Sequence, residues 1–201
     1  MSRFFISVFS VLLLAACGQS STAEKAAEPA AETPAPDVTA AQYVGQTLTN
    51  PIMSAAGAEI GRATLTEGPH GVLIRLDFNA GALSPGWHGL HFHERGTCDD
   101  GSAGFTASGA HVGHGEGTHG LLNSNGPEPG DLPSIFAPER GAFGAEVYTS
   151  MLRLGLGEGV RPAIADADGS ALVIHASHDD QATQPIGGAG ARVACVVFNA
   201  G

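Results

Sequence analysis

Short runs in which apolar and polar residues alternate recur through most of the chain. The clearest covers residues 71–78, where Ile74 and Leu76 alternate with Arg75 and Asp77. A period of two predicts β-strands that are buried on one face. Residues 87–93 alternate again, and other short segments also look like strands. The predicted strands are residues 63–66, 71–78, 87–93, 145–154, 171–175 and 192–198.

Two long stretches, roughly 95–142 and 176–191, show no such period, and no convincing helix is evident. Asp168 and Gly169 predict a turn before the strand at 171–175. Loops of this length in a compact domain are usually functional. The pattern therefore predicts an all-β fold, an antiparallel sandwich or barrel with two long functional loops.

The N-terminal region has the features of an export signal. Arg3 precedes an apolar run over residues 4–16, which is too short to be a stable membrane span. The run ends in Leu-Ala-Ala-Cys at Cys17, which resembles the bacterial lipobox. We expect residues 1–16 to be a signal peptide and Cys17 to be lipidated. The alternative is ordinary secretion with cleavage near Ala16.

Residues 17–41 are rich in Ser, Ala, Glu and Pro and have no apolar period, which predicts a disordered tether. Residues 42–201 are then the folded domain. These features predict an exported lipoprotein that faces the periplasm or the cell exterior and meets the membrane through its lipid anchor only.

Composition narrows the classes of protein and partner. The chain is 43% hydrophobic and only 14% charged, which excludes a coiled coil and a disordered chain. Lys and Arg number 9 against 20 Asp and Glu, giving a net charge of −11. Nucleic acid and an anionic membrane surface are therefore not expected as partners.

Cys98 and Cys195 remain once Cys17 is assigned to the lipobox. An even pair in an exported protein predicts a disulfide, with two free thiols as the alternative. Joined, they would close a loop of nearly the whole domain, worth about 4–5 kcal/mol in the chain-entropy model.

Histidine is the unusual residue, with nine in the chain and five of them between residues 88 and 114. His91 and His93 lie on one face of a predicted strand, about 6–7 Å apart along it. An isolated strand histidine is usually structural. Imidazole also suits copper and zinc, and a carboxylate can complete a zinc site. The further candidates His111, His119, Asp131 and His175 therefore predict metal binding.

Two segments carry a family resemblance. Residues 86–93, Gly-Trp-His-Gly-Leu-His-Phe-His, are followed by Gly-Thr-Cys at 96–98, and residues 187–195 are Gly-Gly-Ala-Gly-Ala-Arg-Val-Ala-Cys. Both resemble signatures of the Cu/Zn superoxide dismutase family, and the likeness covers most of residues 43–199. A bacterial, lipobox-bearing member is the closest description. The resemblance implies an antiparallel Greek-key sandwich or flattened barrel of about eight strands.

The resemblance also implies two metals and their ligands. Copper would be held by His91, His93, His111 and His175. Zinc would be held by His111, as a bridge between the metals, with His119 and Asp131. Asp179 matches a carboxylate that ties a copper histidine to a zinc histidine and fixes the rings.

Three positions need separate comment. Glu128 stands where the family commonly has a third zinc histidine, so it either binds zinc through oxygen or leaves the site weak or empty. His114, in an altered loop after His111, is a substitute ligand or an exposed loop residue. His88 matches a histidine that hydrogen-bonds the scaffold.

The implied activity is conversion of superoxide to dioxygen and hydrogen peroxide at the copper. His111 would carry a proton, and Arg192 would hold the small anion beside the copper. The main alternative is a lipoprotein that binds or delivers copper without useful turnover, followed by a structural or adhesive sandwich. Monomer and homodimer both remain open.

Overall fold

The structure is a computed structural model that describes residues 45–155 and 159–199. The predicted signal peptide, Cys17, the tether and the start of the domain at residue 42 lie outside the described residues. The strands are β1 (Thr47–Ser54), β2 (Glu59–Gly68), β3 (Gly71–Phe78), β4 (Gly86–His93), β5 (Asp131–Ala137), β6 (Phe143–Thr149), β7 (Ser170–His175) and β8 (Arg192–Phe198).

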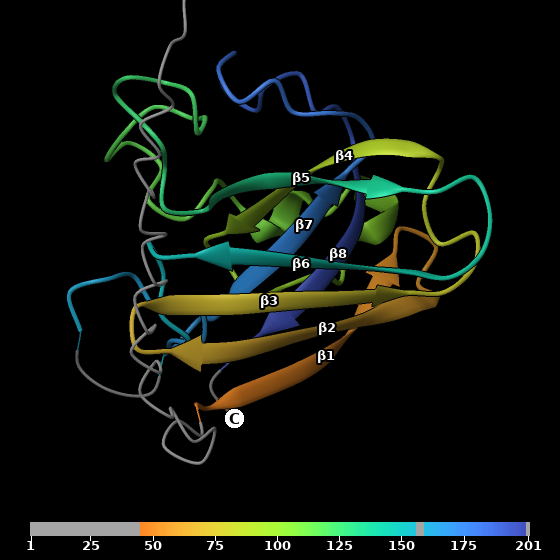
Figure 1. Cartoon of the computed structure of the whole chain (residues 1–201), viewed down its shortest axis with the longest axis horizontal. Coiled ribbons are helices and arrows are strands. Elements are labelled where there is room, and N and C mark those ends of the chain that lie inside the picture. The colour runs from red at the N-terminus through yellow and green to blue at the C-terminus, as the bar shows by residue number, and fades with distance from the viewer. Residues whose placement is uncertain (1–44, 156–158, 200–201) are drawn as a thin grey trace, which may run out of the picture. The chain divides into compact units, whose positions relative to one another are not determined.

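The eight strands form one antiparallel sheet with the order β5-β4-β7-β8-β1-β2-β3-β6. The two outermost strands, β5 and β6, approach each other, so the sheet curls into a nearly closed barrel (Figure 1). Two pairs of strands that follow each other in the chain, β3 with β4 and β6 with β7, are not neighbours in that order. The predicted all-β, eight-stranded antiparallel barrel is confirmed.

Alternation builds the core as the sequence predicts. In β3, Ile74 and Leu76 are fully buried, whereas Arg75 and Asp77 are exposed and form an ion pair of 3.2 Å. In β4, Leu90 and Phe92 belong to the same core cluster. Burying one such side chain contributes about 1.5–3 kcal/mol. The barrel interior therefore fixes which face of β4 turns outward.

Two strands were not predicted from the sequence. β5 lies inside the stretch of residues 95–142 that we expected to be loop, so that prediction is wrong for its last part. β1 was also missed. Each contains a proline, Pro133 or Pro51, and proline lowers the expectation of a strand because it cannot donate to the ladder. β5 is at one end of the sheet order, where proline is tolerated.

Other boundaries also differ from the prediction. The strand expected over residues 145–154 ends at Thr149, and the one expected over 63–66 is ten residues long. Two 3₁₀-helices, η2 (Gly101–Ala103) and η3 (Thr106–Ser108), interrupt the first long loop. The predicted turn before β7 is present, where the amide of Gly169 donates to Asp166.

The first long loop is fastened to the outside of the barrel. Cys98 forms the predicted disulfide with Cys195 of β8, across a sequence separation of 97 residues. Phe105, 1% exposed, packs with Cys195, Ala171 and Val173 in a second cluster. The outer face of β7 is therefore buried as well, and the loop that carries several histidines is fixed over it.

Candidate metal centre

Backbone pairing brings the predicted site residues together. Strand β4 pairs with both β5 and β7, and an isolated bridge joins its end to the first long loop. The directly opposed pairs are His91 with Asp131, His93 with His111, and His175 with Arg192. Residues far apart in the sequence thus meet because of the sheet register.

Four imidazoles form the first group, which we call the imidazole cluster: His91, His93, His111 and His175. Ring nitrogens of His91, His93 and His175 all lie within 4.8 Å of one another. The His111 ring centroid is 4.2 Å from that of His91 and 5.0 Å from that of His93. The structure therefore brings together all four residues for which copper binding was predicted.

Each ring of the imidazole cluster uses one nitrogen and leaves the other free. His93 Nδ1 donates to the Gly109 carbonyl and His175 Nδ1 to the Gly190 carbonyl, both at 2.9 Å. Their Nε2 atoms, together with His91 Nδ1 and His111 Nε2, are buried without a partner among the described residues. Buried polar atoms are rarely left unpaired. Four such atoms in one cluster fit a metal ion with imidazole ligands.

Burial favours the neutral form of three of these rings, those of His91, His93 and His175. Desolvation lowers the pKa of His91, and it lowers that of His93 well below the usual range. Burial, with the neighbouring imidazole His91, lowers the pKa of His175 to about 3. A metal binds only the neutral form of imidazole. Because their pKa values are lowered, these three rings can offer a nitrogen lone pair to a metal at physiological pH.

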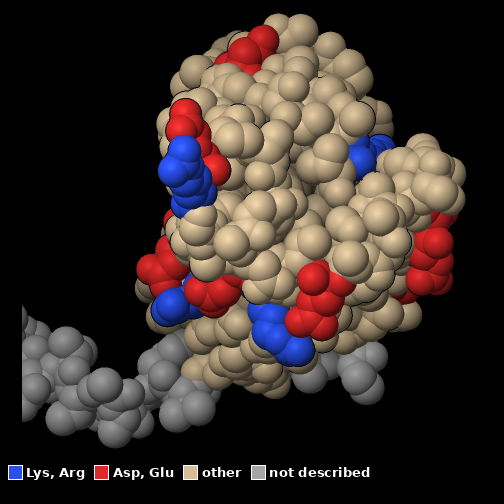
Figure 2. All heavy atoms as spheres, turned by 90° about the vertical axis from the view of Figure 1, so that its right-hand side faces the viewer, with Lys and Arg blue, Asp and Glu red and all other residues tan. Residues whose placement is uncertain are grey.

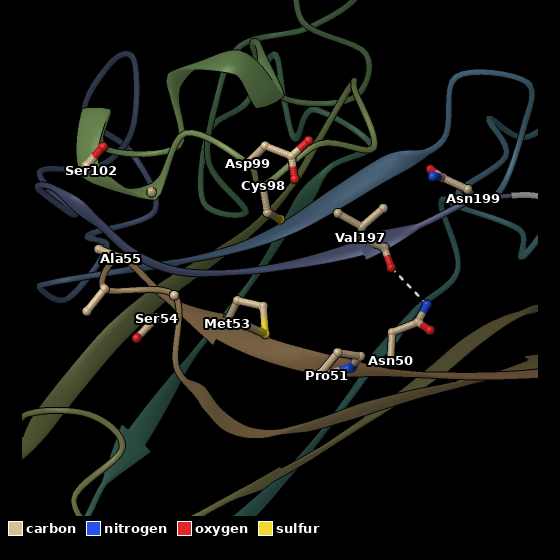
Figure 3. Close-up of a pocket in the computed structure, with 13 residues that line it drawn as sticks. Asn50, Pro51, Met53, Ser54, Ala55, Cys98, Asp99, Ser102, Val197 and Asn199 are labelled. Atoms are coloured by element: carbon tan, nitrogen blue, oxygen red, sulfur yellow. Dashed lines mark hydrogen bonds between the residues drawn. The ribbon is translucent and has the colours of Figure 1, made fainter.

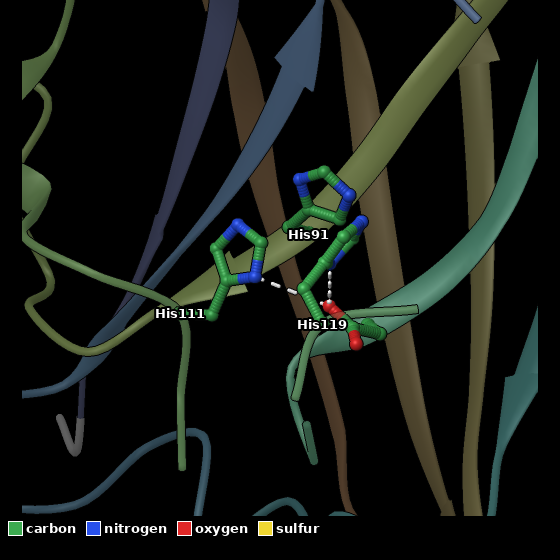
Figure 4. A group of neighbouring side chains, drawn as sticks. His91, His111 and His119 are labelled. Atoms are coloured by element: carbon green, nitrogen blue, oxygen red, sulfur yellow. Dashed lines mark hydrogen bonds and ion pairs between the residues drawn. The ribbon is translucent and has the colours of Figure 1, made fainter. Parts of the chain in front are cut away.

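A second group, the mixed cluster, consists of His111, His119, Glu128 and Asp131. Asp131 Oδ1 accepts hydrogen bonds from His119 Nδ1 at 2.8 Å and His111 Nδ1 at 3.1 Å (Figure 4). Glu128 Oε2 lies 2.8 Å from the same His111 Nδ1. His91, His111, His119 and Asp131 also offer ligand atoms within 4.8 Å of one another. His111 thus has one nitrogen in each cluster.

Three carboxylates are buried in or beside the mixed cluster: Glu128 is 2% exposed, Asp131 3% and Asp179 0%. Within the described part of the chain their ion-pair partners are all imidazoles, and no Lys or Arg contacts them. A buried charge without adequate pairing costs several kcal/mol. A divalent cation would offset this cost, and two imidazoles with carboxylate oxygens are a donor set that zinc accepts.

Asp179 connects the two clusters. Its Oδ2 is 2.6 Å from His91 Nε2, and its Oδ1 is 3.2 Å from His119 Nε2. Burial opposes the charge of His119, but its hydrogen bonds to Asp131 and Asp179 outweigh burial and raise its pKa to about 10. Desolvation would raise the pKa of Asp179, but its hydrogen bonds with His119 and His91 outweigh desolvation and lower that pKa. This carboxylate therefore fixes both rings at once.

Arg192 lies beside the imidazole cluster and is held by the loop. Nη1 donates to the Phe105 carbonyl at 2.8 Å and to Ser108 Oγ at 3.0 Å, and Nη2 donates to the Gly109 carbonyl at 3.0 Å. Because a guanidinium has five N–H donors, two have no partner among the described residues. Its charge also lowers the pKa of His93 and His175.

Some supporting residues were not predicted from the sequence. The Gly109 carbonyl accepts from both His93 and Arg192, and Gln184 bonds the backbone of His119 through both its amide atoms. A backbone carbonyl has no sequence signature, and a loop glutamine is common, so no pattern marks them. His88 contacts two carbonyls, those of His175 and Ser84, in keeping with a scaffold role.

One hollow of the described structure lies away from both clusters. It has a volume of about 660 Å³ and lies along β1 beside Cys98, lined by Asn50, Met53, Asp99 and Asn199 among others (Figure 3). None of its lining residues is a histidine. On the face in Figure 2, most Lys and Arg side chains lie next to Asp or Glu, so that face presents no broad basic surface. No helix among the described residues has the length and apolar character needed to span a membrane.

An antiparallel barrel that carries four buried, converging imidazoles next to a buried carboxylate cluster defines a metalloprotein with two adjacent sites. The copper/zinc superoxide dismutase family model matches residues 59–198, and the chain belongs to this family. The family implies copper and zinc.

Individual relatives agree with this assignment. The chain is 54% identical to a Cu-Zn superoxide dismutase of Caulobacter vibrioides over 144 residues, 71% of this chain and 79% of that protein. A Cu-Zn superoxide dismutase of Aquifex aeolicus is 37% identical, over 73% of this chain and 83% of that one. Among solved structures, the Cu/Zn superoxide dismutase of Brucella abortus aligns with a TM-score of 0.59 and 28% identity, covering 76% and 99% of the two chains.

Proposed function

We propose that this protein is a superoxide dismutase, which converts two superoxide anions and two protons to dioxygen and hydrogen peroxide. The observation that carries the proposal is the set of four buried imidazole nitrogens that have no partner within residues 45–155 and 159–199. The chain's curated relatives are named Cu-Zn superoxide dismutases. Copper delivery without turnover is not favoured, because a copper carrier has no need of Arg192, a cation that can hold a small anion beside the copper ligands. Asp179, which contacts a histidine of each cluster, accompanies the ligands as well.

We assign copper to the unpartnered nitrogens of His91, His93, His111 and His175. Bound copper would supply one-electron redox chemistry to superoxide. The carbonyls of Gly109 and Gly190 orient two of these rings, and such partners fix the tautomer that a metal requires.

We assign zinc to His111, His119 and Asp131, with Glu128 as the fourth ligand. His111 is the residue shared between the sites, with Nδ1 on the carboxylate side and Nε2 on the copper side. When it is not bound to copper, this Nε2 would hold a proton for the peroxide product.

Arg192 binds the substrate. Its fixed charge and the two N–H donors that have no partner among the residues described suit a small anion, whereas the chain as a whole carries a charge of −11. Attraction of superoxide therefore depends on a local positive charge rather than on the net charge of the protein.

The disulfide indicates an exported protein. We further propose export by the segment 1–16, lipid attachment at Cys17 and a location facing the periplasm or cell exterior. The lipobox-like sequence supports this proposal, and mass spectrometry of the membrane-extracted protein tests it. The absence of a nucleic-acid partner stays a prediction, and monomer and homodimer stay alternatives.

An assay of superoxide loss, with copper and zinc analysis of the same sample, tests the function. Rapid loss that requires both bound metals supports a dismutase. Bound copper without turnover would indicate a carrier, and failure to bind either metal would leave only a scaffold.

A further inference from the structure

Glu128 is a buried carboxylate with two imidazole partners. Its Oε2 is 2.8 Å from His111 Nδ1, and its Oε1 is 2.8 Å from His114 Nδ1. Glu128 is 2% exposed, whereas the His114 side chain is 59% exposed. His114 is thus a surface side chain. Among the described residues it makes one polar contact with another side chain, and that side chain is Glu128 of the mixed cluster.

The backbone places His114 at this point. A turn from His111 to His114 is closed by the His114 amide, which donates to the His111 carbonyl at 3.0 Å. Gly113 within it has φ +78°, and a Cβ there would come within 2.4 Å of Pro129 Cδ. Only glycine permits this close approach. The turn therefore packs on the residue next to Glu128 and puts both its imidazoles on one carboxylate.

The segment that carries Glu128 is fixed from the other side. Asp131 Oδ2 accepts from the Glu128 amide at 3.0 Å, and the Asp131 amide donates to the Glu128 carbonyl at 3.0 Å. The amide of Gly130 also donates to the Val112 carbonyl at 3.0 Å. The two backbones are thereby locked, and the remaining freedom of Glu128 is the torsion of its side chain.

We propose that His114 is a positioning residue for zinc binding: its Nδ1–H holds Oε1 of Glu128 and so presents Oε2 to the ion beside His111, His119 and Asp131. The inference rests on the proposed function, since it deepens the zinc assignment made there. His114 is not itself a ligand, because the nitrogen nearest the cluster is used by Glu128.

The experiment compares His114→Ala, His114→Asn and His114→Gln in the full chain loaded with copper and zinc. An Asn amide nitrogen takes the place of Nδ1, whereas a Gln amide nitrogen takes that of Nε2. Zinc affinity is measured by competition with a chelator, and the zinc site is then filled with cobalt(II) to record its visible spectrum. His70→Ala, an exposed histidine in the β2–β3 turn, is the matched control.

We expect His114→Ala to weaken zinc binding by about 10- to 100-fold, the usual effect of removing a partner of a ligand. His114→Asn should recover most of this loss, His114→Gln little of it, and His70→Ala should match the unmodified protein. The cobalt spectrum should change in His114→Ala and return in His114→Asn. Copper affinity should be the same in all four variants.

Three results would overturn the inference. One is unchanged zinc affinity in His114→Ala, and another is His114→Asn behaving like His114→Ala. The third is loss of zinc in His114→Ala as complete as in Asp131→Ala, which would make His114 a ligand. In each case the proposed function is not affected if the unmodified protein binds both metals. If the unmodified protein binds no zinc, both the role of His114 and the proposed function are contradicted.

Discussion

The imidazole cluster and the mixed cluster share His111 but are built on different principles. Three members of the imidazole cluster come from the paired strands β4 and β7, and burial lowers their pKa values. The mixed cluster is anionic, and three of its members, His111, His119 and Glu128, belong to the long loop. The strand framework thus supplies neutral nitrogens for a redox metal, and the loop supplies the charge that a divalent ion neutralises.

The largest expected effect comes from removing one nitrogen of the imidazole cluster. His175→Ala should lower the rate of superoxide loss by at least about a thousandfold, since the redox chemistry belongs to the metal. Zinc content should be retained, because His175 does not contact the carboxylates. Metal analysis and activity of the same preparation check this, with the exposed His178→Ala as control. Equal loss of both metals would show that the clusters are not separable.

Asp179 tests the link between the clusters. Asp179→Asn removes the carboxylate that contacts both His91 and His119, so both metals should bind about 10- to 100-fold more weakly. The exposed neighbour Asp180 provides a matched Asp180→Asn control. Chelator competition for each metal is the measurement, and a loss confined to one metal would contradict the bridging role.

Arg192 sharpens the comparison because it serves substrate rather than metal. Arg192→Ala should slow turnover by about tenfold or more, while copper content is unchanged. If copper content and the rate of superoxide loss fell in parallel, the role of Arg192 in attracting the substrate would be contradicted. Because the protein has few cations, the rate of the unmodified protein should change little with salt, and a steep fall would argue for broader electrostatic attraction.

The smallest effect separates the clusters by pH in metal-free protein. An unfolded histidine titrates near 6.5. His175 has a pKa of about 3 in the folded protein, so it stays unprotonated at pH values where the unfolded chain binds a proton. The free energy of unfolding therefore falls as the pH drops from 6.5. Folded His119, with a pKa of about 10, keeps a proton that the unfolded chain loses, so stability also falls as pH rises from 6.5 toward 10.

The free energy of unfolding should therefore be greatest near pH 6.5 and decline on both sides. Urea unfolding at several pH values measures it, with a decline of more than about 1.4 kcal/mol, the equivalent of one pKa unit. A flat profile would contradict the assigned environments of both rings.

The sequence predicted the parts of the fold whose pattern is set by burial. In β3, buried and exposed residues alternate because one face meets the core. In β4, Leu90 and Phe92 enter the core, and the same period of two put His91 and His93 together on the other face, which is also buried. β5 contains Pro133 and could not be predicted. The pairing of β4 with β5, which sets Asp131 opposite His91, therefore could not be predicted either. Long-range register depends on the closed barrel rather than on local pattern.

The candidate site shows the same division. Its side chains were predicted from residue type and family resemblance, including the unusual Glu128. Their orientation depends on carbonyls such as those of Gly109 and Gly190, which carry no side-chain identity. The contact between His114 and Glu128 likewise follows from the path of a loop that lacks any repeating pattern.

Anomalous X-ray diffraction at the copper edge, from crystals of the metal-loaded protein, tests the central claim most directly. We predict a single copper bonded to the four nitrogens that lack partners in the described part of the chain: His91 Nδ1, His93 Nε2, His111 Nε2 and His175 Nε2. Copper bound elsewhere, or through the nitrogens that now face Gly109, Gly190 and Asp179, would contradict the account.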